Sequence, residues 1–284
     1  NNDFWHINLG KMPAGSTVAI LHTNDKIGDA IVRSAFLLGL RRSPLKLKQV
    51  VITTPRFYDY WQDCMGVDEV QLVSNRKVDG ALKTVTSLVP FLIKHRRKFD
   101  VLVNFDQYCR VGEFFKASFL KSQITVGFSK EMFALFNYSI PNNIDGTNLR
   151  TPAERTRDLL ALFEVRTDRT VYPVHIPVGR SDLVLDSQDR PRVLLNAYSN
   201  SEHRSFSVGT LRSLSRAILE QMSNAQVYVN LPARSSAYDG WNSEEDERLT
   251  RVMPLRSQNE LFDFVNQMDA VVTPDTGIAH IAAG

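Results

Sequence analysis

Short apolar runs alternate with amphipathic helical runs along most of the chain, and this alternation constrains the fold most strongly. Thr17–His22 is apolar and rich in β-branched residues, which is typical of a buried strand, and it ends in a polar segment, Thr23–Gly28. From Ile27 onward the apolar residues recur with helical spacing. Strands that alternate with helices predict a parallel sheet covered by helices on both faces.

The alternation of predicted strands and helices continues to the end of the chain. In the first part it predicts strands at Thr17–His22, Gln49–Thr53, Glu69–Val73, Asp100–Phe105 and Gln123–Val126, helices from Ile27 to Arg42 and at Arg56–Cys64, Ala81–Arg97, Gly112–Leu120 and Pro152–Phe163, and an irregular stretch at Tyr138–Asn148. In the second part it predicts strands at Arg192–Tyr198, Gln226–Leu231 and Asp269–Thr273 and helices at Val208–Gln221, Glu244–Thr250 and Ser257–Gln267.

A linker separates these two parts. Tyr172–Arg192 is rich in Pro, Gly, Asp and Ser and has no sustained period, which is typical of a linker. We therefore predict two Rossmann-like domains, residues 1–178 and 179–284, the second incomplete at its C-terminus. Ligands of open α/β sheets bind at the carboxyl ends of the strands, so we expect the two domains to face one central cleft.

Composition excludes several other classes of protein. The 284 residues are 43% hydrophobic and 23% charged, which excludes a disordered, collagenous or coiled-coil chain. A net charge of +3 gives no argument for a nucleic-acid partner. Two cysteines and no metal-binding Cys/His cluster favour a reducing compartment. No apolar run approaches the ~20 residues of a membrane-spanning helix.

The segment Val272–His280 carries the residues best suited to bind phosphate. Asp275, Thr276 and Gly277 stand at a predicted helix start, where free backbone N–H groups and the positive end of the helix dipole favour an anion. Gly277 would let a ligand approach the backbone closely. The same residues would also serve as an ordinary N-cap, and the residue types alone do not exclude that interpretation.

Asn24–Asp29 forms a similar junction in the first domain. It lacks the full G-x-G-x-x-G pattern, so it does not predict a dinucleotide site or a nicotinamide-dependent oxidoreductase. Asp29 could be a carboxylate satisfied by the helix dipole alone. The functional alternative is a general base that faces the cleft and activates a hydroxyl.

Three phrases resemble the heptosyltransferase family in their order and spacing: Asn24–Asp29, Ala153–Arg157 and Val272–Ala283. The resemblance covers nearly the whole chain from Val18, and Asp-Thr-Gly-x-x-His-x-Ala-Ala is its most specific part. It implies a GT-B fold and inverting, metal-independent transfer of heptose from ADP-heptose to the lipopolysaccharide core. It also implies a cytoplasmic enzyme that binds the donor in its C-terminal domain and the acceptor in its N-terminal one.

The resemblance assigns roles to individual residues. Asp29 matches the catalytic base, and Lys26 and Gly28 lie on the acceptor side. The donor residues that it implies are Ser199, Asn200, Arg204, Glu244, Asp275, Thr276, Gly277 and His280. At Arg204 the family usually has a Lys, so the charge is kept while the geometry of the phosphate contact changes. Glu244, the candidate ribose ligand, follows an apparent insertion at Ala233–Asn242.

No Asp-x-Asp motif occurs in the chain, and we expect neither a metal nor a cofactor. Basic clusters at Arg41–Lys48 and Lys94–Lys98 are either solvated helix ends or contacts to anionic lipid or a phosphorylated acceptor. Such contacts would make the protein peripheral to the inner membrane. Three alternatives stay open: a transferase with another nucleotide sugar, one with a protein acceptor, and a silent GT-B module that binds nucleotide.

Overall fold

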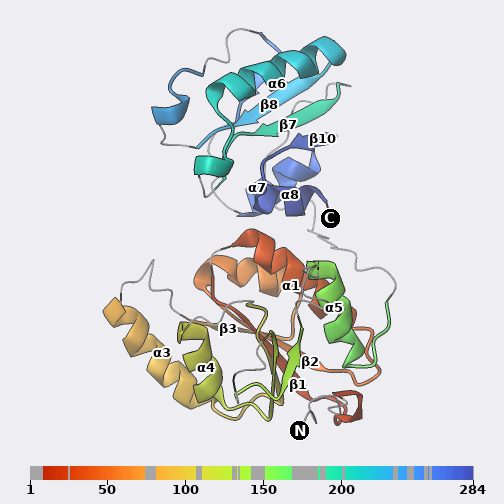
Figure 1. Cartoon of the computed structure of the whole chain (residues 1–284), viewed down its shortest axis with the longest axis vertical. Coiled ribbons are helices and arrows are strands. Elements are labelled where there is room, and N and C mark those ends of the chain that lie inside the picture. Colours follow the sequence, from red (N-terminus) through yellow and green to blue (C-terminus); the bar gives the residue numbers. More distant parts are fainter. Residues whose placement is uncertain are drawn as a thin grey trace. The chain divides into compact units, whose positions relative to one another are not determined.

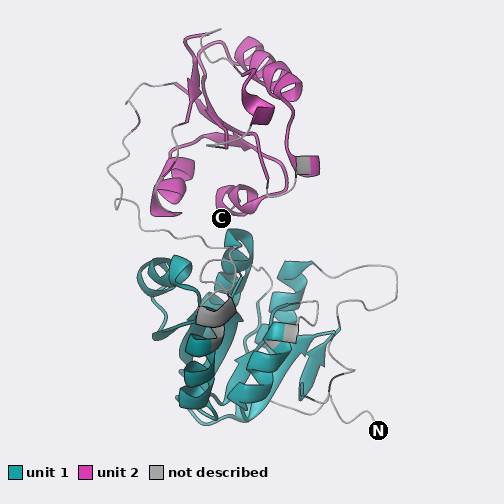
Figure 2. Cartoon of the chain, turned by 90° about the vertical axis from the view of Figure 1, so that its left-hand side faces the viewer, with its two compact units in different colours: residues 1–173 teal, residues 174–284 magenta. Residues whose placement is uncertain are grey.

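A computed structural model of the chain is shown in Figure 1. It describes residues 9–24, 26–73, 81–106, 111–129, 133, 135–141, 151–167, 185, 190–199, 202–232, 236–241, 246–252, 255 and 258–283. The chain divides into two compact units, residues 1–173 and 174–284 (Figure 2). The predicted boundary between residues 178 and 179 falls in a stretch outside the described residues.

The first unit is built on a six-stranded parallel sheet. The strands are β1 (Thr17–His22), β2 (Lys48–Thr53), β3 (Glu69–Leu72), β4 (Val101–Val103), β5 (Ile124–Phe128) and β6 (Tyr138–Ile140). Their order is β3-β2-β1-β4-β5-β6, and every neighbouring pair is parallel. The sheet extends in both directions from β1. Ligands of such sheets bind where the strand order reverses, so the segment that follows β1 is a candidate binding segment.

Helices and short helical turns connect these strands. They are η2 (Leu9–Lys11), α1 (Ile27–Leu40), η3 (Pro55–Phe57), η4 (Tyr60–Cys64), α3 (Ala81–His95), α4 (Val111–Leu120) and α5 (Pro152–Ala161). Helix α1 packs on α5, and α3 packs on α4 (Figure 1). At the first contact a Cβ added to Gly39 would lie 2.5 Å from Cδ1 of Leu160, so any larger residue would require the Leu160 side chain to shift. This contact fixes α5 against the helix that follows β1.

The second unit is a four-stranded parallel sheet of order β10-β7-β8-β9. Its strands are β7 (Arg192–Asn196), β8 (Gln226–Asn230), β9 (Leu249–Arg251) and β10 (Ala270–Val272), and its helical elements are η5 (Glu202–Arg204), α6 (Val208–Gln221), η6 (Ser236–Tyr238), α7 (Gln258–Asn266) and α8 (Gly277–Ala282). Its core joins Val193, Leu195 and Val227 of the sheet to Leu211 of α6 and to Trp241.

Three expectations about local structure were wrong. Tyr138–Ile140 was expected to be irregular, but it is strand β6, which pairs with β5 and buries Tyr138 and Ile140. Leu249–Arg251 is strand β9 instead of the end of a helix, because it pairs with β8 at the edge of the sheet. The helix expected at Arg56–Cys64 is a 3₁₀ turn followed by a π turn. No helix in the described part of the chain is long and apolar enough to cross a membrane.

Candidate active site

Asp29 lies in the first turn of α1, directly after the loop that follows β1, and its side chain is partly exposed. Asn24 Nδ2 donates a hydrogen bond of 2.8 Å to Asp29 Oδ2, and Asn24 Oδ1 accepts one of 3.1 Å from the backbone N–H of Lys26. One amide side chain therefore holds both the carboxylate and the loop that leads to it. Asp29 also lines the cavity described below.

The buried side chain of His22 contacts the same loop. His22 ends β1 and is fully buried, and this burial, together with the charge of Arg33, lowers its pKa well below the ordinary value of 6.5. Trp61 Nε1 can only donate, and it lies 3.1 Å from His22 Nδ1. The neutral ring therefore carries its proton on Nε2, which donates to the carbonyl oxygen of Lys26 at 3.4 Å. The Trp61 ring is itself fully buried.

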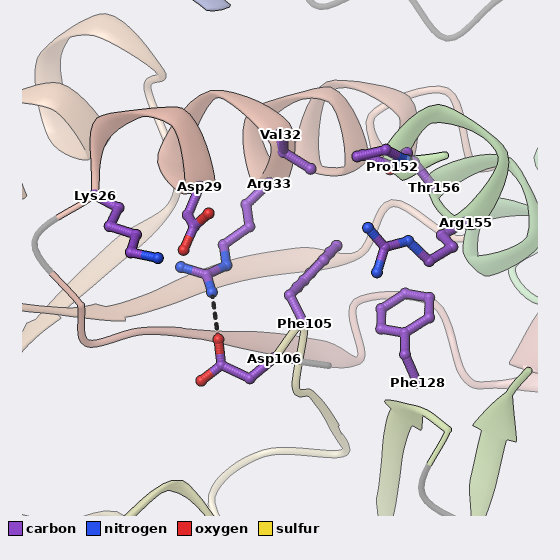
Figure 3. A pocket seen from close by; sticks show the side chains of 10 residues that line it. All are labelled: Lys26, Asp29, Val32, Arg33, Phe105, Asp106, Phe128, Pro152, Arg155 and Thr156. Atoms are coloured by element: carbon purple, nitrogen blue, oxygen red, sulfur yellow. Dashed lines mark hydrogen bonds and ion pairs between the residues drawn. The ribbon is translucent and has the colours of Figure 1, made fainter. Parts of the chain in front are cut away.

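Asp29 lines a cavity of about 270 Å³ in the first unit (Figure 3). Its walls come from the start of α1, the segment after β4, β5 and the start of α5. The residues that line it are Lys26, Asp29, Val32, Arg33, Phe105, Asp106, Phe128, Pro152, Arg155 and Thr156. Figure 3 shows the side chains of Lys26, Asp29 and Arg33 directed toward the same space. Asp29 therefore lies at the start of a helix and also lines this cavity.

Arg33 stands one helical turn after Asp29 and is almost completely buried, with 3% of its side chain exposed. Its Nη2 donates to Oδ1 of Asp106 at 3.3 Å. Its guanidinium carbon lies 5.9 Å from the ring centre of Phe105. Within the described residues, neither Nε nor Nη1 of Arg33 has a hydrogen-bond partner. Arg33 was not among the predicted site residues, although the i, i+4 spacing from Asp29 places both on one helix face.

Arg155 enters the cavity from the other side, on α5 (Figure 3). Its helix begins with a capping box in which Thr151 Oγ1 accepts from the N–H of Glu154 and Oε2 of Glu154 accepts from the N–H of Thr151. This cap fixes the first turn and therefore the position of Arg155. The guanidinium carbon lies 5.6 Å from the ring centre of Phe128, within the range of a cation–π contact. Arg155 belongs to the segment Ala153–Arg157, whose resemblance to the family assigns this residue no role.

In the second unit, Asp275, Thr276 and Gly277 form the turn between β10 and α8. Thr276 Oγ1 accepts a hydrogen bond of 3.3 Å from the N–H of Ile278, so Thr276 is the N-cap of α8. Thr276 Oγ1 also lies 3.1 Å from Thr273 Oγ1, which in turn accepts from Asn196 Nδ2 at 2.9 Å. A chain of polar contacts thus ties the turn to the carboxyl end of β7.

The loop after β7 reaches the same turn. Arg204 Nη1 lies 3.0 Å from Oδ2 of Asp275, and both side chains are largely exposed. Ser199 lies in that loop, where its N–H donates to Ser205 Oγ at 3.0 Å. The loop after β7, which contains the predicted donor residues Ser199 and Arg204, therefore contacts the turn that contains a third one, Asp275. Gly277 and His280 lie on α8 and are partly exposed, while Asn200 and Glu244 are outside the described residues.

Comparison with known proteins agrees with this arrangement. The structure resembles E. coli heptosyltransferase WaaC with ADP-2-deoxy-2-fluoro heptose, with a TM-score of 0.69, 16% identity and coverage of 94% of this chain and 85% of that one. It resembles E. coli ADP-heptose lps heptosyltransferase II, with a TM-score of 0.62, 15% identity and coverage of 94% and 81%. A family 9 glycosyltransferase from Veillonella parvula gives a TM-score of 0.70 at 15% identity, with coverage of 95% and 78%.

These likenesses confirm the predicted GT-B fold with its two Rossmann-like domains. No match was found among curated protein sequences. The model of the family named "Glycosyltransferase family 9 (heptosyltransferase)" matches residues 95–284, which is well over half of the chain. The chain is therefore a glycosyltransferase and belongs to family 9, the heptosyltransferase family.

Proposed function

We propose that the protein transfers heptose from ADP-heptose to a lipopolysaccharide core acceptor, with inversion at the anomeric carbon and without a metal. Family membership supports this proposal, as does the likeness to WaaC, which has been solved with ADP and with ADP-2-deoxy-2-fluoro heptose. The observation that carries it is the carboxylate of Asp29, held by Asn24 and open to a cavity. We assign acceptor binding to the first unit, with Lys26 and Gly28 beside the base.

In the proposed reaction, Asp29 accepts the proton of an acceptor hydroxyl while the oxygen of that hydroxyl attacks the anomeric carbon. The bond from this carbon to the diphosphate breaks, and ADP leaves with the electron pair. One displacement from the opposite face inverts the configuration. A positioned carboxylate is among the usual proton acceptors for a step of this kind.

The second unit would bind the donor. We assign its diphosphate to the Asp275–Gly277 turn and to Arg204, and we assign supporting donor contacts to Ser199, Asn200, Glu244 and His280. Backbone N–H groups at a helix start and a guanidinium both stabilise the negative charge that develops on the leaving phosphate. These groups would meet the charge that a Mg²⁺ ion meets in metal-dependent transferases, so the proposed step needs no metal.

The presence of Arg204 in place of lysine also leaves open a transferase that uses another nucleotide sugar. A guanidinium binds phosphate as a planar fork, whereas the lysine of the family pattern acts as a point charge, so another nucleotide sugar could fit this loop. The decisive experiment is a transfer and hydrolysis screen of ADP-, UDP- and GDP-sugars with core oligosaccharide and peptide acceptors. Preferred turnover of ADP-heptose supports the proposal. Preference for another donor or a peptide acceptor supports those alternatives, and binding without turnover supports the silent module.

We further propose a cytoplasmic protein that contacts the anionic face of the inner membrane through α3 and α4. These neighbouring helices expose four large apolar side chains, Val89, Ile93, Phe115 and Phe119, and Ile93 is 68% exposed. Exposed basic residues follow at the C-terminal ends of the same helices: Lys94, Arg96, Arg97, Lys98 and Lys121. Apolar side chains beside basic ones suit a surface of anionic lipid.

Vesicle flotation tests this surface. The protein should float with vesicles that contain phosphatidylglycerol and remain unbound with pure phosphatidylcholine. Ile93→Glu combined with Phe119→Glu should abolish flotation, whereas Met222→Glu, at an exposed apolar residue of the second unit, should leave it unchanged. Equal flotation of the double variant would reject the α3–α4 surface without bearing on the transfer reaction.

A further inference from the structure

One buried side chain connects the two loops of the second unit to which the donor diphosphate is assigned. Asn196 is the last residue of β7, and only 1% of it is exposed. Its Nδ2 donates to the backbone carbonyl oxygen of Tyr198 at 3.0 Å, in the loop after β7, and to Thr273 Oγ1 at 2.9 Å. Thr273 directly follows β10, the neighbour of β7 in the sheet. The carboxamide of Asn196 thus joins the starts of both loops.

The hydrogen bonds of this carboxamide fix its orientation. A backbone carbonyl oxygen only accepts, so the atom that faces Tyr198 is Nδ2, whose two hydrogens go to Tyr198 and Thr273. Oδ1 then accepts from Nδ2 of Asn230 at 3.0 Å, and Asn230 is the register partner of Asn196 on β8. Each polar atom of the Asn196 side chain has a partner, and a buried, satisfied group of this kind holds its neighbours rigidly.

From Thr273 the polar contacts continue to the turn before α8. Thr273 Oγ1 donates to the carbonyl oxygen of Pro274 at 3.0 Å and lies 3.1 Å from Thr276 Oγ1. Thr276 is the N-cap of α8 and accepts from the N–H of Ile278. The position of Thr273 therefore affects the position of the helix start, and the carboxamide of Asn196 holds Thr273.

The same two loops also meet at the surface of the unit. There Arg204 pairs with Asp275, and both side chains are largely exposed, so the ion pair contributes little to holding the loops together. An exposed ion pair can separate when a phosphate binds, whereas the buried contacts of Asn196 can remain. The surface pair therefore can exchange its anion while the buried carboxamide keeps the loops in place.

We propose that Asn196 is a positioning residue for the donor diphosphate. Through Tyr198 it holds the loop that contains Arg204. Through Thr273 it holds the Asp275–Gly277 turn. This role rests on the proposed function, which assigns the diphosphate to these two loops. Hydrogen-bond donors stabilise a developing charge best when they already stand in the required geometry, because no reorganisation is then needed. Loss of the carboxamide should therefore weaken nucleotide binding although every group assigned to the nucleotide is still present.

A matched pair of variants at Thr273 tests this connection. Thr273→Val keeps the shape of the side chain and removes the oxygen that accepts from Asn196, whereas Thr273→Ser keeps the oxygen. Calorimetric ADP affinity should fall at least tenfold in Thr273→Val and stay within threefold of wild type in Thr273→Ser. Asn196→Leu should also weaken ADP binding at least tenfold. Equal ADP affinity of the valine and serine variants would overturn the proposal.

Val227→Ala is the control for a general loss of stability. Val227 lies on β8 in the same sheet and is completely buried, so its truncation removes packing without changing the polar contacts of Asn196. It should bind ADP within twofold of wild type at a temperature at which every variant is folded. A tenfold loss of affinity in this control would show that any damage to the sheet weakens ADP binding, and it would overturn the role of Asn196.

Amide hydrogen exchange, measured by NMR without a ligand, tests the positioning itself. The N–H of Phe206 is hydrogen-bonded in the loop after β7, and the N–H of Ile278 is hydrogen-bonded in the turn before α8, so the two amides report on the two loops. Asn196→Leu should accelerate the exchange of both at least tenfold. Gln226, at the opposite end of β8 from Asn230, should exchange as in the wild type.

The two measurements distinguish the positioning role from the proposed function. Faster exchange of both amides, with a wild type that binds no nucleotide, would reject the donor assignment and support Asn196 as the residue that holds the loops. Unchanged exchange at Phe206 and Ile278 in Asn196→Leu would reject the positioning role, even if the transfer reaction is found. If Asn196→Leu does not fold, Thr273→Val provides the same test at Ile278, and unchanged exchange there is equally contradictory.

Discussion

Arg204 Nη1 and Asp275 Oδ2 lie 3.0 Å apart and join two loops that are 71 residues apart in the sequence. Their side chains are 51% and 79% exposed, and an ion pair in such a setting contributes about 0–1 kcal/mol to stability. The pair is therefore easily exchanged for another anion. The proposed function assigns that role to the diphosphate of the donor.

Arg204→Ala is expected to weaken ADP binding about 10- to 150-fold, which corresponds to the ~1.5–3 kcal/mol of one charge-assisted contact. Arg204→Lys should recover part of this loss, since the charge returns without the planar fork. Calorimetric titration of ADP measures both. Arg212→Ala is the control, because Arg212 is an exposed arginine of the same unit that donates to the carbonyl of Gly240. Equal losses in the control and the test variant would remove Arg204 from the donor site.

Gly277→Val should abolish ADP binding, because a β-branched side chain at the first residue of α8 would fill the space that the diphosphate needs. Gly209→Val provides the comparison, since Gly209 also lies in the first turn of a helix, α6. It should bind ADP as the wild type does. If Gly277→Val retains wild-type affinity, the Asp275–Gly277 turn is only a helix cap.

The contact between α1 and α5 gives a prediction about stability. Gly39→Ala would force a Cβ to 2.5 Å from Leu160, and overpacking of this kind costs about 1–3 kcal/mol of unfolding free energy. Adding Leu160→Ala should cost less than the sum of the two single changes. Gly112→Ala, on α4 where a Cβ meets nothing within 4 Å, should instead stabilise by ~0.4–1 kcal/mol. Urea denaturation of the four variants measures these differences.

The stability of the protein should fall in acid because of His22. Its pKa is lowered in the folded state, chiefly by burial, so the folded ring stays neutral where the unfolded one takes up a proton. Its contribution is fully present above the unfolded value near 6.5 and is lost as the pH falls below it, by up to about 1.4 kcal/mol per pH unit. Denaturation midpoints between pH 5 and 8 should show this slope. His22→Gln should flatten it, and an unchanged slope would assign the effect to other groups.

The sequence predicts most of the strands and helices correctly because hydrophobic periodicity determines them locally. The errors fall where pairing with a neighbouring strand decides the structure: Tyr138–Ile140 and Leu249–Arg251 are three-residue edge strands, too short to show a period. The identity of the family was likewise predictable from contiguous motifs such as Val272–Ala283.

The candidate site was predictable only where its residues are close in sequence. Asp29 follows a recognisable strand and loop, and Asp275–Gly277 follow another. The walls of the cavity, in contrast, come from segments that meet only after folding, such as Phe105 in the segment after β4 and Arg155 on α5. In the sequence Arg33 is one of several polar residues of a helix, and only the folded chain shows that it is buried and that its Nε and Nη1 have no hydrogen-bond partner among the described residues.

The role of Asp29 is the central claim, and one pair of measurements tests it most directly. Asp29→Asn keeps the size of the side chain and its place beside Asn24 but removes the proton acceptor. We expect calorimetric ADP affinity within twofold of wild type and a turnover of ADP-heptose lowered by ~10²–10⁴, the range for a lost general base. Turnover within about threefold of wild type, with the variant folded and ADP bound, would contradict the assignment of Asp29 as the base.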